Sequence, residues 1–288
     1  MPCENALYLY IYVLFSESQV IMGQHEAKSI IDKETRSQFI HHLLNDIRAL
    51  EIMVEKNLIE NDVIRIGAEQ EFCLVNDQWR PAFNAEEVLQ AIDDPHFTTE
   101  LARYNLEINL DPKELKGTCF SDVRNQLNAL LQKASRAAQN HGSNIVLTGI
   151  LPSIGKRELD FDYMTPNERY WEINQITKEL RGSDFELNLS GVDELSLTHD
   201  SVLLEACNTS FQTHLQVPSN DFVSSYNWSQ VIAGPVLSIC TNSPLLLGRE
   251  LWSETRIALF QQSIDTRRST HVIKDQRARV TLGNQWAK

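Results

Sequence analysis

An alternation of polar and apolar residues between positions 64 and 75 constrains the fold of this chain more than any other feature. The apolar positions are Ile64, Ile66, Phe72 and Leu74. Arg65, Glu69 and Glu71 fall on the opposite face, because side chains two apart on a strand share a face. We therefore predict a strand with an apolar back and an acidic front. Carboxylates this close require a cation between them or a strongly shifted pKa, unless the strand face is simply solvated.

Three further segments, 106–110, 185–189 and 210–217, alternate in the same way. Their polar positions are Glu107, Asn109, Glu186, Asn188, Gln212, His214 and Gln216. A solvated sheet face would carry more Lys, Thr, Ser and Arg than these segments do. We interpret the shared polar front as a platform for cations and ligands. Its oxygen donors favour Mg²⁺ or Mn²⁺ over zinc, which prefers Cys and several His.

Helical periodicity separates these strands along the chain. The predicted helices cover 35–57, 121–140, 166–181, 220–239 and 249–263, and a further apolar strand covers 144–151. Strands of a parallel sheet buried on both faces would be apolar throughout, which these are not. We therefore predict one α+β domain with a largely antiparallel sheet, helices on its back and an open polar front.

Composition excludes several classes of protein. The net charge is −13 and no basic stretch is interleaved with aromatic residues, which argues against a nucleic-acid surface. Five cysteines without a CxxC pair favour a reducing compartment, and we expect a cytoplasmic protein. The apolar run 6–15 is too short to span a membrane. We expect residues 1–21 to be a non-essential extension and residues 22–288 to form a single domain.

Several ordered motifs carry a resemblance to a known family. They are GAEQEF at 67–72, ELARYNLEINLDP at 100–112, TGILPS at 148–153, MTPNERY at 164–170, EACNTSFQTHLQV at 205–217, YNWSQVIAGPVL at 226–237 and NSPLLLGRELWSETRIALFQQS at 242–263. From about residue 60 to its end, the chain resembles glutamate–cysteine ligase family 2, the carboxylate–amine ligases. The resemblance implies the fold of a glutamine-synthetase-like catalytic domain, a curved antiparallel sheet backed by helices.

The same resemblance implies an ATP-dependent ligation of small-molecule substrates. ATP phosphorylates the γ-carboxylate of glutamate, and an amine, classically that of cysteine, captures the acyl phosphate. The family's metal-ligand positions match Glu69, Glu71, Glu100, Glu107 and His214. Arg256 matches a catalytic position that binds an anionic group of glutamate or of the ATP cofactor. The alternatives are a first-turn helical position for Glu100, a packed histidine at 214 and a surface helix charge at Arg256.

The chain departs from the family near its end. Neither GxxxxGK[ST] nor GxGxxG is present, so ATP would be held through its metals and by arginine. Family members continue beyond the position of Lys288 with further strands, and we expect the C-terminal part of the domain to be missing from this chain. Two other functions stay open: a phosphotransferase on the same fold, or an inactive nucleotide- or amino-acid-binding fragment. The sequence does not fix the oligomeric state, and a homodimer is one expectation.

Overall fold

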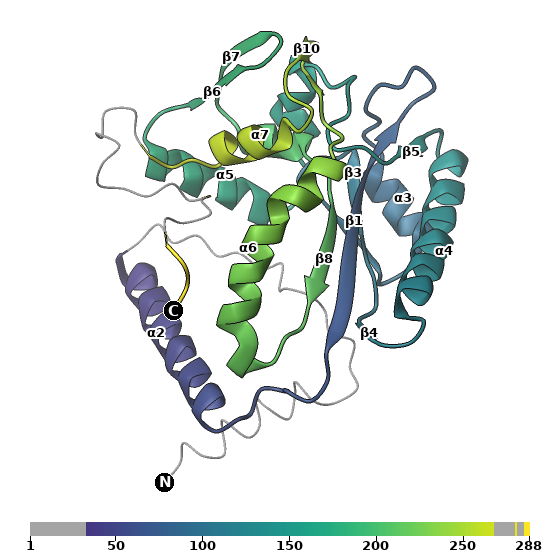
Figure 1. Ribbon diagram of the computed structural model, residues 1–288. Coiled ribbons are helices and arrows are strands. Elements are labelled where there is room, and N and C mark those ends of the chain that lie inside the picture. Colours follow the sequence, from purple (N-terminus) through teal and green to yellow (C-terminus); the bar gives the residue numbers. More distant parts are fainter. Residues whose placement is uncertain (1–32, 268–279, 281–284) are drawn as a thin grey trace.

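The computed structural model describes residues 33–267, 280 and 285–288 (Figure 1). The predicted extension over residues 1–21 lies outside the described residues. The helices are α2 (Lys33–Glu55), α3 (Ala85–Ile92), α4 (Cys119–Asn140), α5 (Glu168–Arg181), α6 (Phe222–Ile239) and α7 (Arg256–Ser263). Four short 3₁₀ helices accompany them: η1 (Lys156–Leu159), η2 (Phe161–Tyr163), η3 (Val202–Cys207) and η4 (Ser219–Asp221).

A six-stranded antiparallel sheet is built around its longest strand, β1 (Arg65–Val75). The registers place β3 (Asn105–Asn109) and β4 (Lys113–Glu114) along one edge of β1. The other edge pairs with β8 (Phe211–Leu215) and β5 (Asn144–Val146), while β2 (Phe97–Thr99) pairs with β3. The predicted α+β fold with an antiparallel sheet is confirmed. The predicted strand 144–151 is shorter than expected, because only its first three residues pair with β1.

Helices α3 and α4 cover one face of this sheet, on the right in Figure 1. The sheet contributes four side chains with no exposed surface to the core beneath them: Phe72, Leu74, Leu106 and Ile108. Helix α4 contributes Leu130, Ala134 and Ala138, which recur every four residues and therefore share one helix face. The apolar back predicted for β1 is thus confirmed at Phe72 and Leu74, whereas Ile64 lies before the strand and is 43% exposed.

The opposite face of the sheet is polar over only part of its length, which corrects the expectation of an open front. Cys73 and Val75 share this face with Glu71, and both are fully buried in a second, larger core. That core also contains side chains from α5 and α7 and from the hairpin β6 (Phe185–Ser190) and β7 (Glu194–His199). The polar front is therefore confined to the first part of β1, because the residues that follow Glu71 on this face are apolar.

Two predicted elements differ from the structure. Strand β6 pairs only with β7 in a separate two-stranded sheet, so Glu186 and Asn188 do not join the polar front of β1. The helix predicted over 249–263 begins only at Arg256. The residues before it form β10 (Arg249–Glu250), which pairs with β9 (Leu245–Leu246). Local alternation and helical spacing do not reveal these long-range pairings.

Helix α5 begins two residues later than Pro166 suggested. The side chain of Asn167 caps it by accepting a hydrogen bond from the Arg169 amide at 3.0 Å. Gly182 ends the helix at a φ of 72°, in the left-handed region that glycine enters without a Cβ clash.

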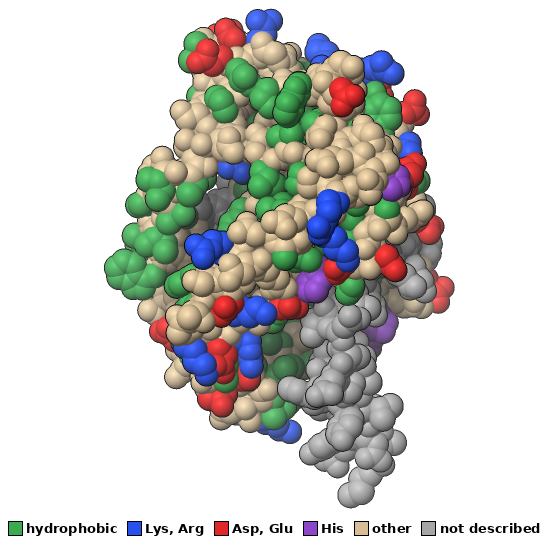
Figure 2. Space-filling model, turned by 90° about the vertical axis from the view of Figure 1, so that its right-hand side faces the viewer, with side chains coloured by type: hydrophobic (Ala, Val, Ile, Leu, Met, Phe, Trp, Pro, Cys, Tyr) green, Lys and Arg blue, Asp and Glu red, His purple; other side chains and the backbone are tan. Residues whose placement is uncertain are grey.

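Hydrophobic side chains are exposed among charged ones on the face of the molecule that Figure 2 shows. Over the whole described surface, α2 and α6 carry many of them, and α6 has no buried residue. Phe211 and Leu215 of β8 are also exposed, contrary to the apolar back predicted for that strand. Among the described helices, none has the length and apolar character to cross a bilayer.

Candidate functional site

The register between β1 and β3 brings two glutamates face to face. Glu71 lies directly opposite Glu107, and Glu69 lies opposite Asn109. Directly opposed side chains on antiparallel strands have Cβ atoms about 5 Å apart, and like charges there are destabilising. The sheet therefore holds two carboxylates where a counter-charge or a proton is required.

Glu100 joins this pair from the segment that follows β2. Thr98 of β2 is paired with Glu107, and Glu100 lies two residues further along the chain. One carboxylate oxygen each from Glu71, Glu100 and Glu107 lie within 4.8 Å of one another. We call these three residues the carboxylate cluster. The alternative of a first-turn helical position for Glu100 is wrong, because Glu100 follows a strand and precedes no helix until α4.

The environment of the carboxylate cluster opposes its ionisation. Burial, and then the charges of Glu71, Glu107 and Glu205, raise the pKa of Glu100 well above its usual range. Burial also raises the pKa of Glu71 to about 7, although Ser210 lowers it by donating a hydrogen bond to Glu71 Oε2 at 3.1 Å. Without a cation, burial and mutual repulsion therefore favour the protonated forms of Glu71 and Glu100.

The other two predicted metal ligands lie beside the cluster as a separate pair. The register of β8 on β1 places His214 opposite Gly67, on the same face as Glu69 and Glu71. His214 Nε2 lies 3.6 Å from Glu69 Oε1. Burial and the charge of Glu107 raise the pKa of Glu69, while His214 lowers it. His214 is half-exposed, so the alternative of a packed core histidine is wrong.

The donor set fits a hard divalent cation. The cluster consists of carboxylates alone, with the oxygen ligands that Mg²⁺ and Mn²⁺ prefer and no thiolate that would favour zinc. A cation at this position would replace the protons that burial otherwise retains. Glu69 and His214 continue the same polar face beside the cluster.

A cavity of about 1000 Å³ adjoins the cluster and includes Glu71 in its lining. Strand β8 and helix α6 contribute to its walls, together with the segment 147–149. Three further charged side chains line it: Glu205, Glu254 and Arg256. The cavity thus connects the carboxylate cluster with the arginine that the sequence singled out.

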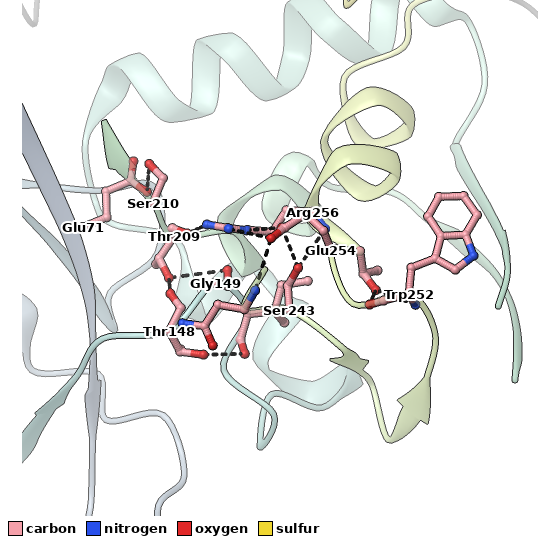
Figure 3. A network of polar contacts seen from close by, with 12 residues as sticks. Glu71, Thr148, Gly149, Thr209, Ser210, Ser243, Trp252, Glu254 and Arg256 are labelled. Atoms are coloured by element: carbon pink, nitrogen blue, oxygen red, sulfur yellow. Dashed lines mark hydrogen bonds and ion pairs between the residues drawn. The ribbon is translucent and has the colours of Figure 1, made fainter. Parts of the chain in front are cut away.

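Arg256 is held in this cavity by a dense polar network (Figure 3). Its Nε and one terminal nitrogen donate to the two carboxylate oxygens of Glu254 at 2.5 and 2.8 Å. The other terminal nitrogen donates to the backbone carbonyl of Thr209 at 2.7 Å. Glu254 is buried, and it also accepts a hydrogen bond from Ser243 at 2.7 Å. Arg256 is therefore fixed in position rather than free on a helix surface.

A glycine makes this arrangement possible. A Cβ on Gly149 would lie 2.6 Å from the carbonyl oxygen of Asn242 and 2.8 Å from Nε of Arg256. Since the first contact is with backbone, a larger residue would displace either the 242–243 turn or the arginine. The TGILPS motif therefore has a packing role at the cavity wall.

Three contributors to the site escaped the sequence reasoning. Glu205 in η3 is close enough to raise the pKa of Glu100, and its own pKa is raised to about 7 by burial and by Glu71. Ser210 bonds Glu71, and Glu254 pairs with Arg256. Glu205 and Ser210 lie inside the motif at 205–217, and Glu254 is two residues from Arg256, but no pattern in the sequence shows which side chains they approach.

Comparisons with known proteins found one family model and a solved structure that are similar to this chain. The model of a family described as Glutamate-cysteine ligase family 2 (GCS2) matches residues 65–281. Among solved structures, the chain is similar to the glutamate–cysteine ligase of Francisella tularensis in complex with AMP. That match has 12% identity and a TM-score of 0.34, and it covers 63% of this chain and 31% of that chain. No curated protein matches the chain.

Proposed function

The chain belongs to glutamate–cysteine ligase family 2, and from this premise we propose that it is an ATP-dependent carboxylate–amine ligase. The proposed substrates are glutamate, ATP and an amine such as that of cysteine. The products would be a γ-glutamyl amide, ADP and phosphate. The observation that carries this proposal is the carboxylate cluster at the edge of a cavity large enough for small-molecule substrates.

We propose that Glu71, Glu100 and Glu107 hold Mg²⁺ or Mn²⁺, with Glu69 and His214 completing the platform. A divalent cation bound there would lower the repulsion between a carboxylate and a triphosphate and stabilise the charge that spreads during phosphoryl transfer. The strands supply the rigidity that this role requires, because two of the three glutamates are fixed by one β-ladder register.

Arg256 is proposed to bind an anionic group of a substrate. A guanidinium has five N–H groups, and hydrogen bonds to Glu254 and Thr209 occupy three of them. The remaining two could donate to a carboxylate or phosphate oxygen in the cavity. Glu254 would then serve as the positioning residue that fixes the orientation of the Arg256 guanidinium group.

A reducing, cytoplasmic location is part of the proposal. All four cysteines in the described part of the chain, Cys73, Cys119, Cys207 and Cys240, are free thiols. Burial raises the pKa of Cys73 to about 12, which keeps this thiol protonated and unreactive. Buried thiols of this kind are compatible with a reducing compartment.

The test is an ADP-release assay on the full chain with Mg²⁺, glutamate and a panel of amines, with product identification by mass spectrometry. Ligation predicts ADP release that requires an amine and a product carrying a new amide bond. Release of a phosphorylated product without an amine would instead establish a phosphotransferase. Calorimetric binding of Mg·ATP without turnover would establish the inactive binding fragment and contradict the proposal.

A further inference from the structure

Helix α2 carries an apolar stripe that is about half exposed in the described part of the structure. Five side chains form the stripe: Ile40, Leu43, Ile47, Leu50 and Val54. Each is between 47% and 55% exposed. A helix of a globular protein normally buries such a face against its own core. No described side chain of α2 is buried, so this helix does not serve the core of its own domain.

The stripe follows a seven-residue repeat. Ile40, Ile47 and Val54 recur at intervals of seven, and Leu43 and Leu50 follow the first two of them by three residues. This places β-branched residues at heptad position a and leucine at position d, the combination that favours a pair of helices over larger assemblies in parallel coiled coils. A second copy of this helix carries the matching repeat.

We propose that α2 is a dimerisation helix whose heptad stripe packs against α2 of a second copy of this chain as a short parallel coiled coil. Phe39 and Leu44 flank the stripe and are also about half exposed. Seven half-exposed side chains of this size offer roughly 600 Å² per helix, so the pair would bury on the order of 1,200 Å². This area lies at the lower end for specific interfaces, so the dimer is expected to dissociate on dilution.

Helix α6 is the other exposed apolar helix, and its pattern does not suit the same partner. Its apolar positions, from Phe222 to Ile239, keep no seven-residue repeat, and Pro235 lies within the helix. A proline in a helix interior removes a backbone hydrogen bond and kinks the helix. The continuous repeat of α2 therefore matches a second α2 better than it matches α6.

The charges beside the stripe provide a test of the orientation. Asp46 falls at heptad position g and Glu51 at position e. In a parallel pair, position g of one helix lies against position e of the next heptad in the other, so Asp46 would face Glu51 of the second copy. These like charges repel, and Asp46→Lys would convert the repulsion into attraction.

The experiment is sedimentation equilibrium of the full chain at concentrations from roughly 1 to 300 µM, a range that brackets weak dimers. The wild type is expected to dimerise with rising concentration. Leu43→Lys at position d should weaken the dimer at least tenfold, and Asp46→Lys should tighten it several-fold. Asn45→Lys adds one positive charge, as Leu43→Lys does, but at position f on the far side of the helix. It should leave the dimer unchanged.

Three results of these measurements would contradict the proposed dimer or its parallel orientation. A wild type that stays monomeric throughout the range would overturn the proposal, as would equal effects of Leu43→Lys and Asn45→Lys. Failure of Asp46→Lys to tighten the dimer would overturn the parallel arrangement. Circular dichroism checks that each variant keeps its helical content. Since none of these residues belongs to the carboxylate cluster or the cavity, the outcome is independent of the proposed function.

Discussion

Replacing Glu71 by glutamine should stabilise the cation-free protein above neutral pH. Glu71 has its pKa raised from 4.5 to about 7, chiefly by burial, and the unfolded chain lacks this shift. Folding thus favours the protonated form, and stability falls as pH rises from about 4.5 through 7. The shift corresponds to about 3 kcal/mol once Glu71 is fully ionised. Glutamine removes this cost, and its carbonyl oxygen can still accept the Ser210 hydrogen bond.

The assay is urea unfolding of wild type and Glu71→Gln in EDTA at pH 5 and pH 8. The variant should gain up to about 3 kcal/mol at pH 8 and much less at pH 5. Excess Mn²⁺ should stabilise the wild type at pH 8 by binding the folded state, and it should stabilise the variant less. Glu186→Gln, at an exposed position on β6 outside the central sheet, is the matched control and should change neither result.

Two outcomes would refute this reasoning. The first is a cation-free variant that is no more stable than the wild type at pH 8, because the buried charge would then cost nothing. The second is equal stabilisation of both proteins by Mn²⁺, because Glu71 would then not be a ligand.

Three further predictions concern the site and its support. Glu107→Gln should reduce amine-dependent ADP release by at least about 100-fold without changing the circular dichroism spectrum, since it removes ligand charge at constant volume. Arg256→Ala should lower the free energy of unfolding by about 3 kcal/mol in urea titrations, because it leaves the buried Glu254 unpaired; an unchanged midpoint would show that this pair is not structural. Gly149→Ala should cost about 1–3 kcal/mol, because its Cβ would meet a backbone carbonyl at 2.6 Å, whereas Gly234→Ala, in open space within α6, should not destabilise the protein.

The sequence predicts the central strand and its acidic face well, because a two-residue period records directly which side chains share a face. Glu69, Glu71 and Glu107 could therefore be placed on one surface before any pairing was known. The opposition of Glu71 and Glu107 could not be predicted, since a register depends on how two distant segments align. The same limit explains β6, whose alternation is real but belongs to a separate hairpin.

Features that depend on the path of the chain were beyond the sequence. Glu205 of η3 comes close enough to the carboxylate cluster to raise the pKa of Glu100, and no periodicity in a 3₁₀ helix indicates such a neighbour. The pairing of Arg256 with Glu254 requires a non-helical segment before α7, where helical spacing predicted a continuous helix. These contacts arise from tertiary packing and become visible only once the elements are placed.

The central claim, that Glu71, Glu100 and Glu107 form a divalent cation site, is tested most directly by titrating the metal-stripped full chain with Mn²⁺ at pH 8. Electron paramagnetic resonance measures the free Mn²⁺, with Glu107→Gln and the exposed Glu186→Gln as the paired variants. We predict saturable binding to the wild type and to Glu186→Gln, and binding at least about tenfold weaker to Glu107→Gln. Equal binding by all three proteins would contradict the claim.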